Sequence, residues 1–309
     1  MPSIKVRSFA KINISLDIKG VREDGYHELE TVMQRISLCD EITVKWTPAG
    51  GSKPHTGKDS NEGGQILIGL SCNKYFLPVD ERNIAYKAAA LMAAGYKDRA
   101  GAGRIDIYIE KHIPVAAGLA GGSGNGAAVL IALNKLWGLG LATRELCRIG
   151  AGLGADVPFC VLVQNTGFGC ALCRGIGEEL TPIKNKIKKA VLLVKPSFGV
   201  STKEVYSAID HCRILSRPDN QAIINALKQG DQQALYKNMA NVLEDYTLLQ
   251  YGDVKELKIK LMSETMAEAV MMTGSGPTVF ALFSRLQDAQ KACADFRKQG
   301  YSAFWAKMI

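Results

Sequence analysis

A glycine-rich stretch followed by an apolar segment carries the first candidate chemistry of this sequence, PVAAGLAGGSGNGAAVLIALNKLW at residues 114–137. Glycine allows positive φ angles and close approach to the backbone, and the apolar segment predicts a buried helix from about Asn125 to Leu136. Free N–H groups and the positive dipole end at a helix N-terminus favour an anion, above all a phosphate. The stretch lacks the ending of a Walker loop and the dinucleotide-binding fingerprint. It is interpreted as a phosphate-binding loop or, alternatively, as a site of close packing.

The first strand could present polar groups to a ligand. Apolar residues alternate with polar ones from Ile4 to Ile18, which predicts a long strand with one solvated face. Lys11, Asn13 and Ser15 consequently point to the same side. Two interpretations follow, a plain solvated face of an antiparallel sheet or a row of ligand-binding groups.

An aspartate in the motif GADVPF is a candidate catalytic group. Asp156 stands between apolar residues, where a carboxylate is costly to bury unless it is paired, and a cation such as Lys11 would be its natural partner. The alternative is a helix-capping or turn aspartate.

The motif DGYH could recognise a base. Asp24 and Gly25 predict a turn that leads Tyr26 and His27 onto the next element. These two side chains are interpreted either as core residues or as a stacking platform and a hydrogen-bonding partner for a base. A second small-residue loop, TGSGPTVF at residues 273–280, predicts a tight turn or a backbone wall beside a phosphate.

Length and composition limit the class of protein. A chain of 309 residues is long enough for two domains, and a net charge of +8 suits anionic small molecules or nucleic acid. Because no basic run with interleaved aromatic residues occurs, a solvated basic surface is favoured over nucleic-acid binding. Eight scattered cysteines indicate reduced thiols, and the pair Cys170 and Cys173 lacks the further ligands of a structural zinc site. No stretch is long and apolar enough for a membrane span, so we expect a cytoplasmic protein.

The remaining patterns predict an alternation of strands and helices. Further strands are expected at residues 41–46, 104–111, 189–195, 277–284 and 301–309. Helices are expected at residues 83–95, 143–153, 201–212 with Ser201 or Thr202 as N-cap, 220–230 and 286–300. Residues 47–65, rich in Gly, Ser and Lys, predict a surface excursion.

Six motifs, in order over nearly the whole chain, resemble the 4-diphosphocytidyl-2-C-methyl-D-erythritol kinases, a family of the galactokinase, homoserine kinase, mevalonate kinase and phosphomevalonate kinase superfamily. They are AKINISLDIKGVREDGYHELETV, PVAAGLAGGSGNGAA, GLGADVPFC, RGIGEELTPI, FGVSTKEVY and TGSGPTVFALF. The resemblance implies an α+β fold with an N-terminal ATP-binding domain like domain 2 of ribosomal protein S5, residues 1–170, and a ferredoxin-like substrate domain, residues 171–309. It also implies phosphorylation of the 2-hydroxyl of a cytidine-diphospho-methylerythritol, with ATP and Mg²⁺ as cofactors.

The resemblance assigns a role to each candidate residue. Lys11 and Asp156 match the catalytic lysine and aspartate. The substrate positions are Asn13, Tyr26, His27, Met33 and Tyr206, of which the two tyrosines sandwich the cytosine and His27 hydrogen-bonds it. The ATP positions are Asn83, Lys87, Lys111, Pro114, Gly118, Leu119, Ala120, Gly121, Gly122 and Ser123.

Three residues depart from the family pattern. Met33 replaces a common aromatic residue, and Gly124 replaces the second serine of the phosphate loop. Gly126 replaces a common alanine, which we expect to loosen the first helical turn by up to about 1 kcal/mol.

Alternatives to this function are another small-molecule kinase of the superfamily, a non-catalytic ligand-sensing relative and a nucleic-acid-binding protein. The two catalytic residues and the DGYHELETV motif favour the kinase. We therefore expect a small-molecule partner and ATP, no nucleic acid, no membrane, and a monomer or weak homodimer.

Overall fold

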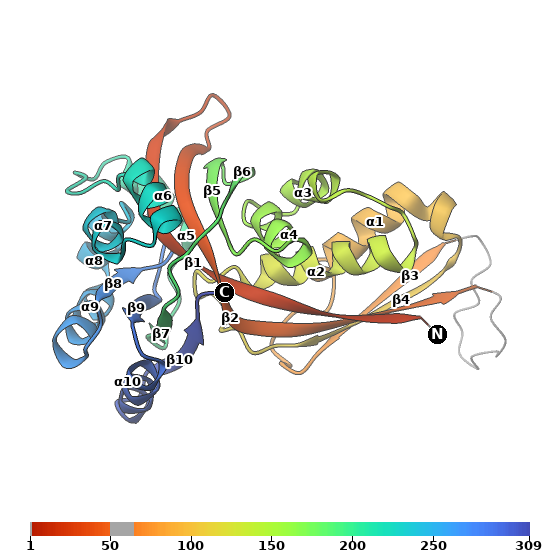
Figure 1. The fold of residues 1–309 in the computed structure, drawn as a ribbon. Coiled ribbons are helices and arrows are strands. Elements are labelled where there is room, and N and C mark those ends of the chain that lie inside the picture. The colour runs from red at the N-terminus through yellow and green to blue at the C-terminus, as the bar shows by residue number, and fades with distance from the viewer. Residues whose placement is uncertain (1, 50–64) are drawn as a thin grey trace. The chain divides into compact units, whose positions relative to one another are not determined.

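The computed structural model describes residues 2–49 and 65–309, which form two compact units assembled from separate segments of the chain (Figure 1). Unit 1 comprises the described residues of Met1–Phe9, Cys39–Ile113 and Gly121–Thr166. Unit 2 comprises Ala10–Leu38, Pro114–Ala120 and Gly167–Ile309. The division into residues 1–170 and 171–309 stays a prediction about which part binds which ligand.

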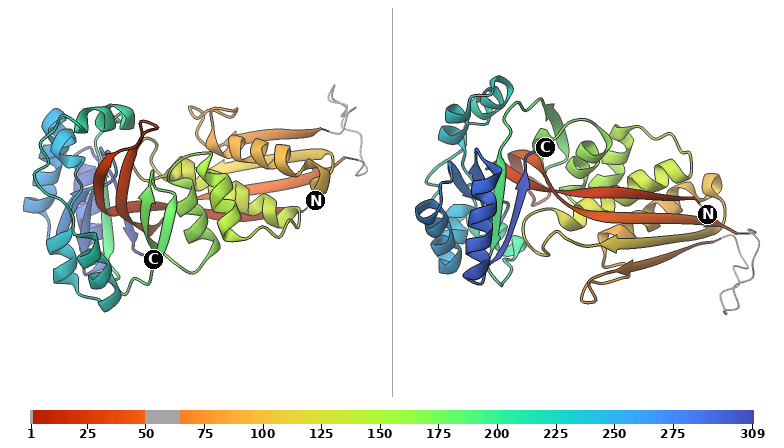
Figure 2. Two further views of the ribbon diagram at one scale, coloured as in Figure 1. Left: turned by 90° about the horizontal axis from the view of Figure 1, so that it is seen from above. Right: turned by 60° about the horizontal axis from the view of Figure 1, so that its bottom comes forward.

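Unit 1 is a small sheet covered by helices. Within it, the C-terminal part of β2 (His27–Pro48) pairs antiparallel with β4 (Gly103–Glu110), and β4 pairs parallel with β3 (Ile66–Cys72). Its helices lie together on one face of these strands in both views of Figure 2. They are α1 (Ile84–Ala100), α2 (Gly121–Leu136), α3 (Thr143–Ala151) and α4 (Val157–Asn165).

Helix α2 packs closely against its neighbours in unit 1 at two of its glycines. A Cβ atom on Gly126 would lie 2.6 Å from Ile84 Cγ2, and one on Gly124 would lie 2.5 Å from Ser8 Oγ. This contact gives a physical reason for glycine at position 126, because an alanine there would collide with Ile84 of α1, while the loosening of the helix stays a prediction. A serine at position 124 would likewise have to displace Ser8.

Unit 2 contains a four-stranded antiparallel sheet in the order β10-β7-β9-β8 (Figure 1). Its strands are β7 (Ala190–Lys195), β8 (Ala269–Met272), β9 (Val279–Phe283) and β10 (Ser302–Lys307). Between β7 and β8 the chain forms α5 (Thr202–Ile209), α6 (Asn220–Gln229), α7 (Gln232–Asn238), α8 (Glu244–Gln250) and α9 (Gly252–Glu264). Helix α10 (Leu286–Lys298) joins β9 to β10. This β-α-β-β-α-β arrangement matches the predicted ferredoxin-like topology.

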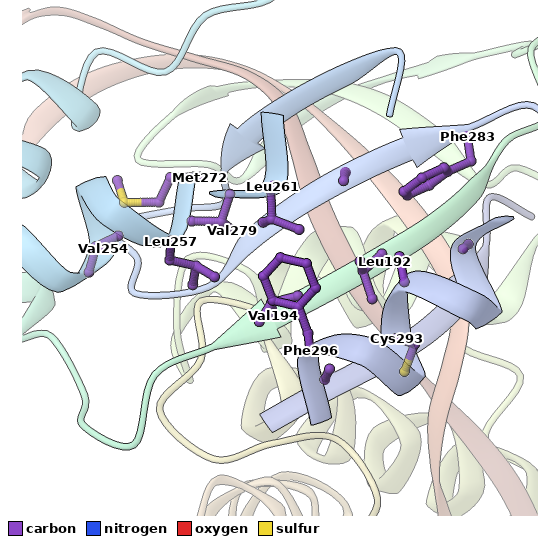
Figure 3. Close-up of a cluster of buried hydrophobic side chains, with 14 of the residues drawn as sticks. Leu192, Val194, Val254, Leu257, Leu261, Met272, Val279, Phe283, Cys293 and Phe296 are labelled. Carbon is purple, nitrogen blue, oxygen red and sulfur yellow. The ribbon is translucent and has the colours of Figure 1, made fainter. Parts of the chain in front are cut away.

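The core of unit 2 lies between this sheet and the helices α9 and α10 (Figure 3). Leu192 and Val194 of β7 face Phe296 of α10, while Leu257 and Leu261 enter the same cluster from α9. Alternate strand residues meet the apolar stripes of two helices, as expected for an α+β layer.

Unit 2 also contains a second set of paired strands, which includes parts of the first two strands of the chain. The N-terminal part of β2 pairs antiparallel with β5 (Cys170–Gly175), and β5 pairs with β6 (Glu179–Ile183). Strand β1 (Ser3–Val21) pairs with β2 and contains the predicted alternating segment.

The N-cap of α5 follows the prediction from the sequence. Ser201 is the N-cap of α5, since its hydroxyl accepts a hydrogen bond from Glu204 N at 3.3 Å. Residues 50–64 of the predicted surface excursion lie outside the described residues. Across the described ranges, the structure contains no helix with the length and hydropathy that spanning a membrane requires.

Candidate active site

The glycine-rich stretch divides into a loop and the first turns of a helix. Helix α2 begins at Gly121, four residues before the predicted start, so Gly121, Gly122 and Ser123 form its first turn. Positive φ angles occur in the preceding loop, at Ala116, Gly118 and Ala120. Because no acidic residue lies in the first turn of α2, its N–H groups and dipole offer an anion site.

A buried lysine adjoins this helix end. Lys111 is 5% exposed, and a Cβ atom on Gly121 would lie 2.7 Å from its Nζ. The ammonium group donates a hydrogen bond to the carboxylate of Asp40, which is fully buried. Burial lowers the pKa of Lys111, while the charge and hydrogen bond of Asp40 oppose that effect.

Asp40 connects several elements of unit 1. Its Oδ1 accepts hydrogen bonds from His112 N at 2.7 Å and Ile113 N at 2.8 Å. In the amide orientation that its neighbours require, Asn125 Nδ2 lies 2.9 Å from Asp40 Oδ2, from Gly121 O and from Ser8 Oγ. One carboxylate therefore holds the end of β4 and, through Asn125, the first turn of α2.

Three other predicted site residues lie at the starts of helices in unit 1. Asn83 is the N-cap of α1: its Oδ1 accepts from Ala85 N at 3.0 Å and its Nδ2 donates to Pro78 O at 2.9 Å. Lys87 is exposed one turn later. Asp156 occupies the N-cap position of α4, as its interpretation as a helix-capping or turn aspartate predicts, although its side chain makes no capping hydrogen bond.

In unit 2, Lys11 lies in a buried polar cluster on β1. Its Nζ donates to Asn13 Oδ1 at 2.7 Å, and the residue is 4% exposed. Asn13 Oδ1 also accepts from Thr273 Oγ1 at 3.1 Å, while Asn13 Nδ2 donates to Thr31 Oγ1 at 2.9 Å. The interpretation of this row as a plain solvated face is therefore wrong, because both side chains are buried and hydrogen-bonded.

Two small-residue loops of unit 2 approach this cluster. A Cβ atom on Gly118, whose φ is +69°, would lie 2.6 Å from Thr273 O. Leu119 O accepts from Lys11 N at 3.2 Å, and a Cβ atom on Gly274 would lie 3.7 Å from Lys11 Nζ. The absence of a side chain at Gly118 thus permits close contact between the two loops.

The predicted base-binding residues are partly brought together in unit 2. The rings of His27 and Tyr206 have centroids 5.3 Å apart and are inclined by 48°. His27 Nε2 lies 3.0 Å from Asp210 Oδ1, just beyond α5. Tyr26 follows the Asp24–Gly25 turn and is 62% exposed, which excludes its interpretation as a core residue. Met33 is buried in β2.

Sequence reasoning missed three residues that hold the predicted site residues in place, namely Asp40, Thr273 and Asp210. Asp40 was visible as an acid within the apolar strand segment SLCDEITV. Thr273 belonged to a recognised loop, whereas Asp210 carried no local signal.

Family models match both parts of the chain. The GHMP kinases N terminal domain matches residues 83–164, and the GHMP kinases C terminal domain matches residues 223–302. Together these ranges cover the described α1 to α4 and most of the chain from α6 to β10.

Similar proteins cover almost the full length. The chain is 46% identical over 305 residues to a 4-diphosphocytidyl-2-C-methyl-D-erythritol kinase of Alkaliphilus oremlandii, covering 97% of this chain and 96% of that protein. It is 39% identical over 306 residues to the enzyme of the same name from Clostridium acetobutylicum, covering 99% and 100%.

Solved structures show the same fold. A crystal structure of 4-(cytidine 5'-diphospho)-2C-methyl-D-erythritol kinase has a TM-score of 0.76 and 29% identity, covering 98% of each chain. Homoserine kinase from Cytophaga hutchinsonii has a TM-score of 0.67 at 18% identity, covering 100% of this chain and 95% of that one, and shares the fold alone.

Proposed function

The chain belongs to the 4-diphosphocytidyl-2-C-methyl-D-erythritol kinases of the GHMP kinase family, and from this we propose how its own residues carry out the reaction. The enzyme transfers the γ-phosphoryl group of ATP to the 2-hydroxyl of 4-diphosphocytidyl-2-C-methyl-D-erythritol. The observation that carries the assignment of roles is the buried Lys11–Asn13 pair beneath two small-residue loops.

Lys11 and Asp156 act on the reacting groups. The hydroxyl oxygen attacks the γ-phosphorus, the bond to the β-phosphate oxygen breaks, and ADP leaves. Asp156, at the start of α4, accepts or orients the hydroxyl proton. Lys11 stabilises negative charge on the hydroxyl and the transferring phosphoryl group, and Asn13 fixes its ammonium group.

The first turn of α2 and the preceding loop bind the ATP phosphates. The N–H groups of Gly121, Gly122 and Ser123 are not used by helical hydrogen bonds and suit phosphate oxygens. Among the described residues no cluster of three or more His, Cys, Asp or Glu side chains could hold a metal alone. This fits Mg²⁺, which takes phosphate oxygens, water and few protein ligands, such as the Ser123 hydroxyl here. When bound, Mg²⁺ neutralises phosphate charge.

The substrate's cytosine binds at Tyr26, His27 and Tyr206. The exposed Tyr26 ring and the Tyr206 ring beside His27 offer flat surfaces for stacking. Because Nε2 of His27 is hydrogen-bonded to Asp210, Nδ1 is the ring nitrogen that can hydrogen-bond the base.

The test is ADP release with ATP, Mg²⁺ and the cytidine-diphosphate substrate. We expect turnover by the wild-type chain, loss of at least about a hundredfold in kcat for Asp156→Asn, and no turnover with methylerythritol phosphate that lacks the cytidine. Asp295→Asn, an exposed acid on α10, serves as the matched control and should retain kcat.

Either of two results would contradict the proposal. Turnover without the cytidine moiety would exclude the base-binding role of Tyr26, His27 and Tyr206 and favour another kinase activity of the superfamily. An Asp156→Asn variant with unchanged kcat would exclude Asp156 from the chemistry.

A further inference from the structure

We infer that Asp40 is a positioning residue of the ATP site, which holds the Lys111 ammonium group at the N-terminus of α2 so that it can pair with nucleotide phosphate. The inference rests on the proposed ATP site. It assigns a role to a carboxylate on β2 that lies 71 residues from Lys111 in the chain.

The location of Lys111 is electrostatically unfavourable without an anion. Its Nζ adjoins the first residue of α2, where the helix dipole is positive and no acidic side chain lies in the first turn. A cation at this end of a helix lowers stability, whereas an anion raises it. Asp40 offsets one positive charge, but the helix end and the ammonium group together still favour a phosphate.

The hydrogen bond to Asp40 leaves other N–H donors of Lys111 for a ligand. An ammonium group carries three N–H donors. In the part of the chain that the structure describes, Asp40 is the only side chain to which Lys111 Nζ donates. Nζ packs directly against Gly121, since a Cβ atom there would lie only 2.7 Å away.

Asp40 is built to fix this geometry. It is fully buried and accepts hydrogen bonds from His112 N and Ile113 N as well as from Lys111. Asn125 Nδ2 bridges the carboxylate to Gly121 O in the same helical turn. The ammonium group and the phosphate-binding N–H groups are therefore held in one frame, which lowers the entropic cost of binding.

Removal of the Asp40 charge also changes the protonation of Lys111. Burial lowers the pKa of Lys111, and Asp40 and the neighbouring Cys72 raise it. In Asp40→Asn the burial remains while the main opposing charge is lost, so Lys111 gives up its proton at a lower pH. Where this lower pKa leaves Lys111 partly deprotonated, ATP binding returns a proton to it.

The experiment is calorimetric titration with ATP and Mg²⁺, which measures binding without turnover. We expect Asp40→Asn to raise the Kd for ATP about tenfold and to make the Kd increase with pH at lower pH values than in the wild type. In buffers of different ionisation enthalpy, ATP binding to Asp40→Asn should take up protons, unlike binding to the wild type. A purely structural role of Asp40 would not produce this proton uptake.

Two further variants keep the test decisive if Asp40→Asn folds poorly. Lys111→Met and the double variant Asp40→Asn with Lys111→Met should raise the Kd equally, because Asp40 acts through Lys111. The double variant leaves no buried charge unpaired and should fold. Glu268→Gln, which breaks the pair that Glu268 forms with the buried Lys189 in unit 2, is the control and should leave the Kd unchanged.

The outcomes separate the two hypotheses. Wild-type protein that does not bind ATP would contradict the proposed function. Wild-type protein that binds ATP, together with an unchanged Kd in either Asp40→Asn or the double variant, would overturn the role of Asp40 alone.

Discussion

Gly126 of α2 and Ile84 of α1 are in such close contact that a Cβ atom on the glycine would lie 2.6 Å from Ile84 Cγ2 and 3.4 Å from Ile84 O. The side chain of Ile84 is therefore the main barrier, whereas its backbone oxygen lies close to an ordinary van der Waals distance. Ile84 directly follows the N-cap Asn83, so the position of Gly126 determines how near the start of α1 lies to the start of α2.

We predict that Gly126→Ala destabilises the protein. Alanine favours the helix by about 1 kcal/mol over glycine, but overpacking at a rigid contact costs about 1–3 kcal/mol. The net effect should be a loss of about 1 kcal/mol in the free energy of unfolding, measured by urea denaturation.

Gly95 provides the matched control for this substitution. It lies inside α1, and a Cβ atom there would meet nothing within 4 Å. Gly95→Ala should therefore raise the free energy of unfolding by up to about 1 kcal/mol. Equal stabilisation by both substitutions would contradict the packing argument.

Local sequence patterns were sufficient to predict the elements whose apolar residues follow a clear pattern. The alternation from Ile4 to Ile18 correctly predicted β1, and the apolar runs predicted β7 and β9. The start of α2 was wrong because glycine has a poor helix propensity, and packing against α1 and Ser8 overrides that propensity. Helix α4 was not predicted, because a short apolar run such as VPFCVLV does not distinguish helix from strand.

The candidate site was only partly predictable for a similar reason. Motifs identified Lys11 and Asn13, which lie two residues apart in the chain and are hydrogen-bonded in the site. They also identified the glycine-rich stretch, whose Leu119 O accepts a hydrogen bond from Lys11 N. The residues that hold them come from distant segments, as Thr273 does for Asn13 and Asp40 does for Lys111. Such pairings depend on tertiary structure and leave no periodic signal in one sequence.

Asp210 should contribute to base recognition through His27. Its carboxylate lies 3.0 Å from His27 Nε2 and thereby fixes which ring nitrogen carries the proton. We predict that Asp210→Ala raises the KM for the cytidine-diphosphate substrate about tenfold while the KM for ATP stays unchanged, as measured by initial rates of ADP release.

Substitution of a surface acid is the control for a general effect of removing one negative charge. Asp295 on α10 forms an exposed pair with Lys298 at 3.6 Å. Asp295→Ala should leave both KM values unchanged. If Asp210→Ala raised the two KM values equally, His27 would not be the residue through which it acts.

The polar cluster around Glu268 should give unit 2 a specific acid sensitivity. Glu268 accepts hydrogen bonds from Lys189 Nζ, Ser284 Oγ and Tyr236 Oη. Burial alone would raise the pKa of this carboxyl, but the three donors and the charge of Lys189 hold the pKa below its ordinary value of 4.5. The pKa of Tyr236 shifts in the opposite direction, because burial and the adjacent carboxylate raise the pKa of its hydroxyl.

The sign of the resulting pH dependence follows from this lowered pKa. The stabilisation from ionised Glu268 is present above the unfolded value of 4.5 and is lost as the pH falls through the folded pKa. We predict that Glu268→Gln lowers the free energy of unfolding by about 2 kcal/mol at neutral pH, and that its difference from the wild type shrinks below pH 4.5. Urea denaturation of both proteins at neutral and acid pH measures this difference.

Glu256→Gln, at an exposed position of α9, is the control and should show a small difference that does not change with pH. A constant deficit of Glu268→Gln at both pH values would mean that packing of the side chain, and not its charge, stabilises the cluster.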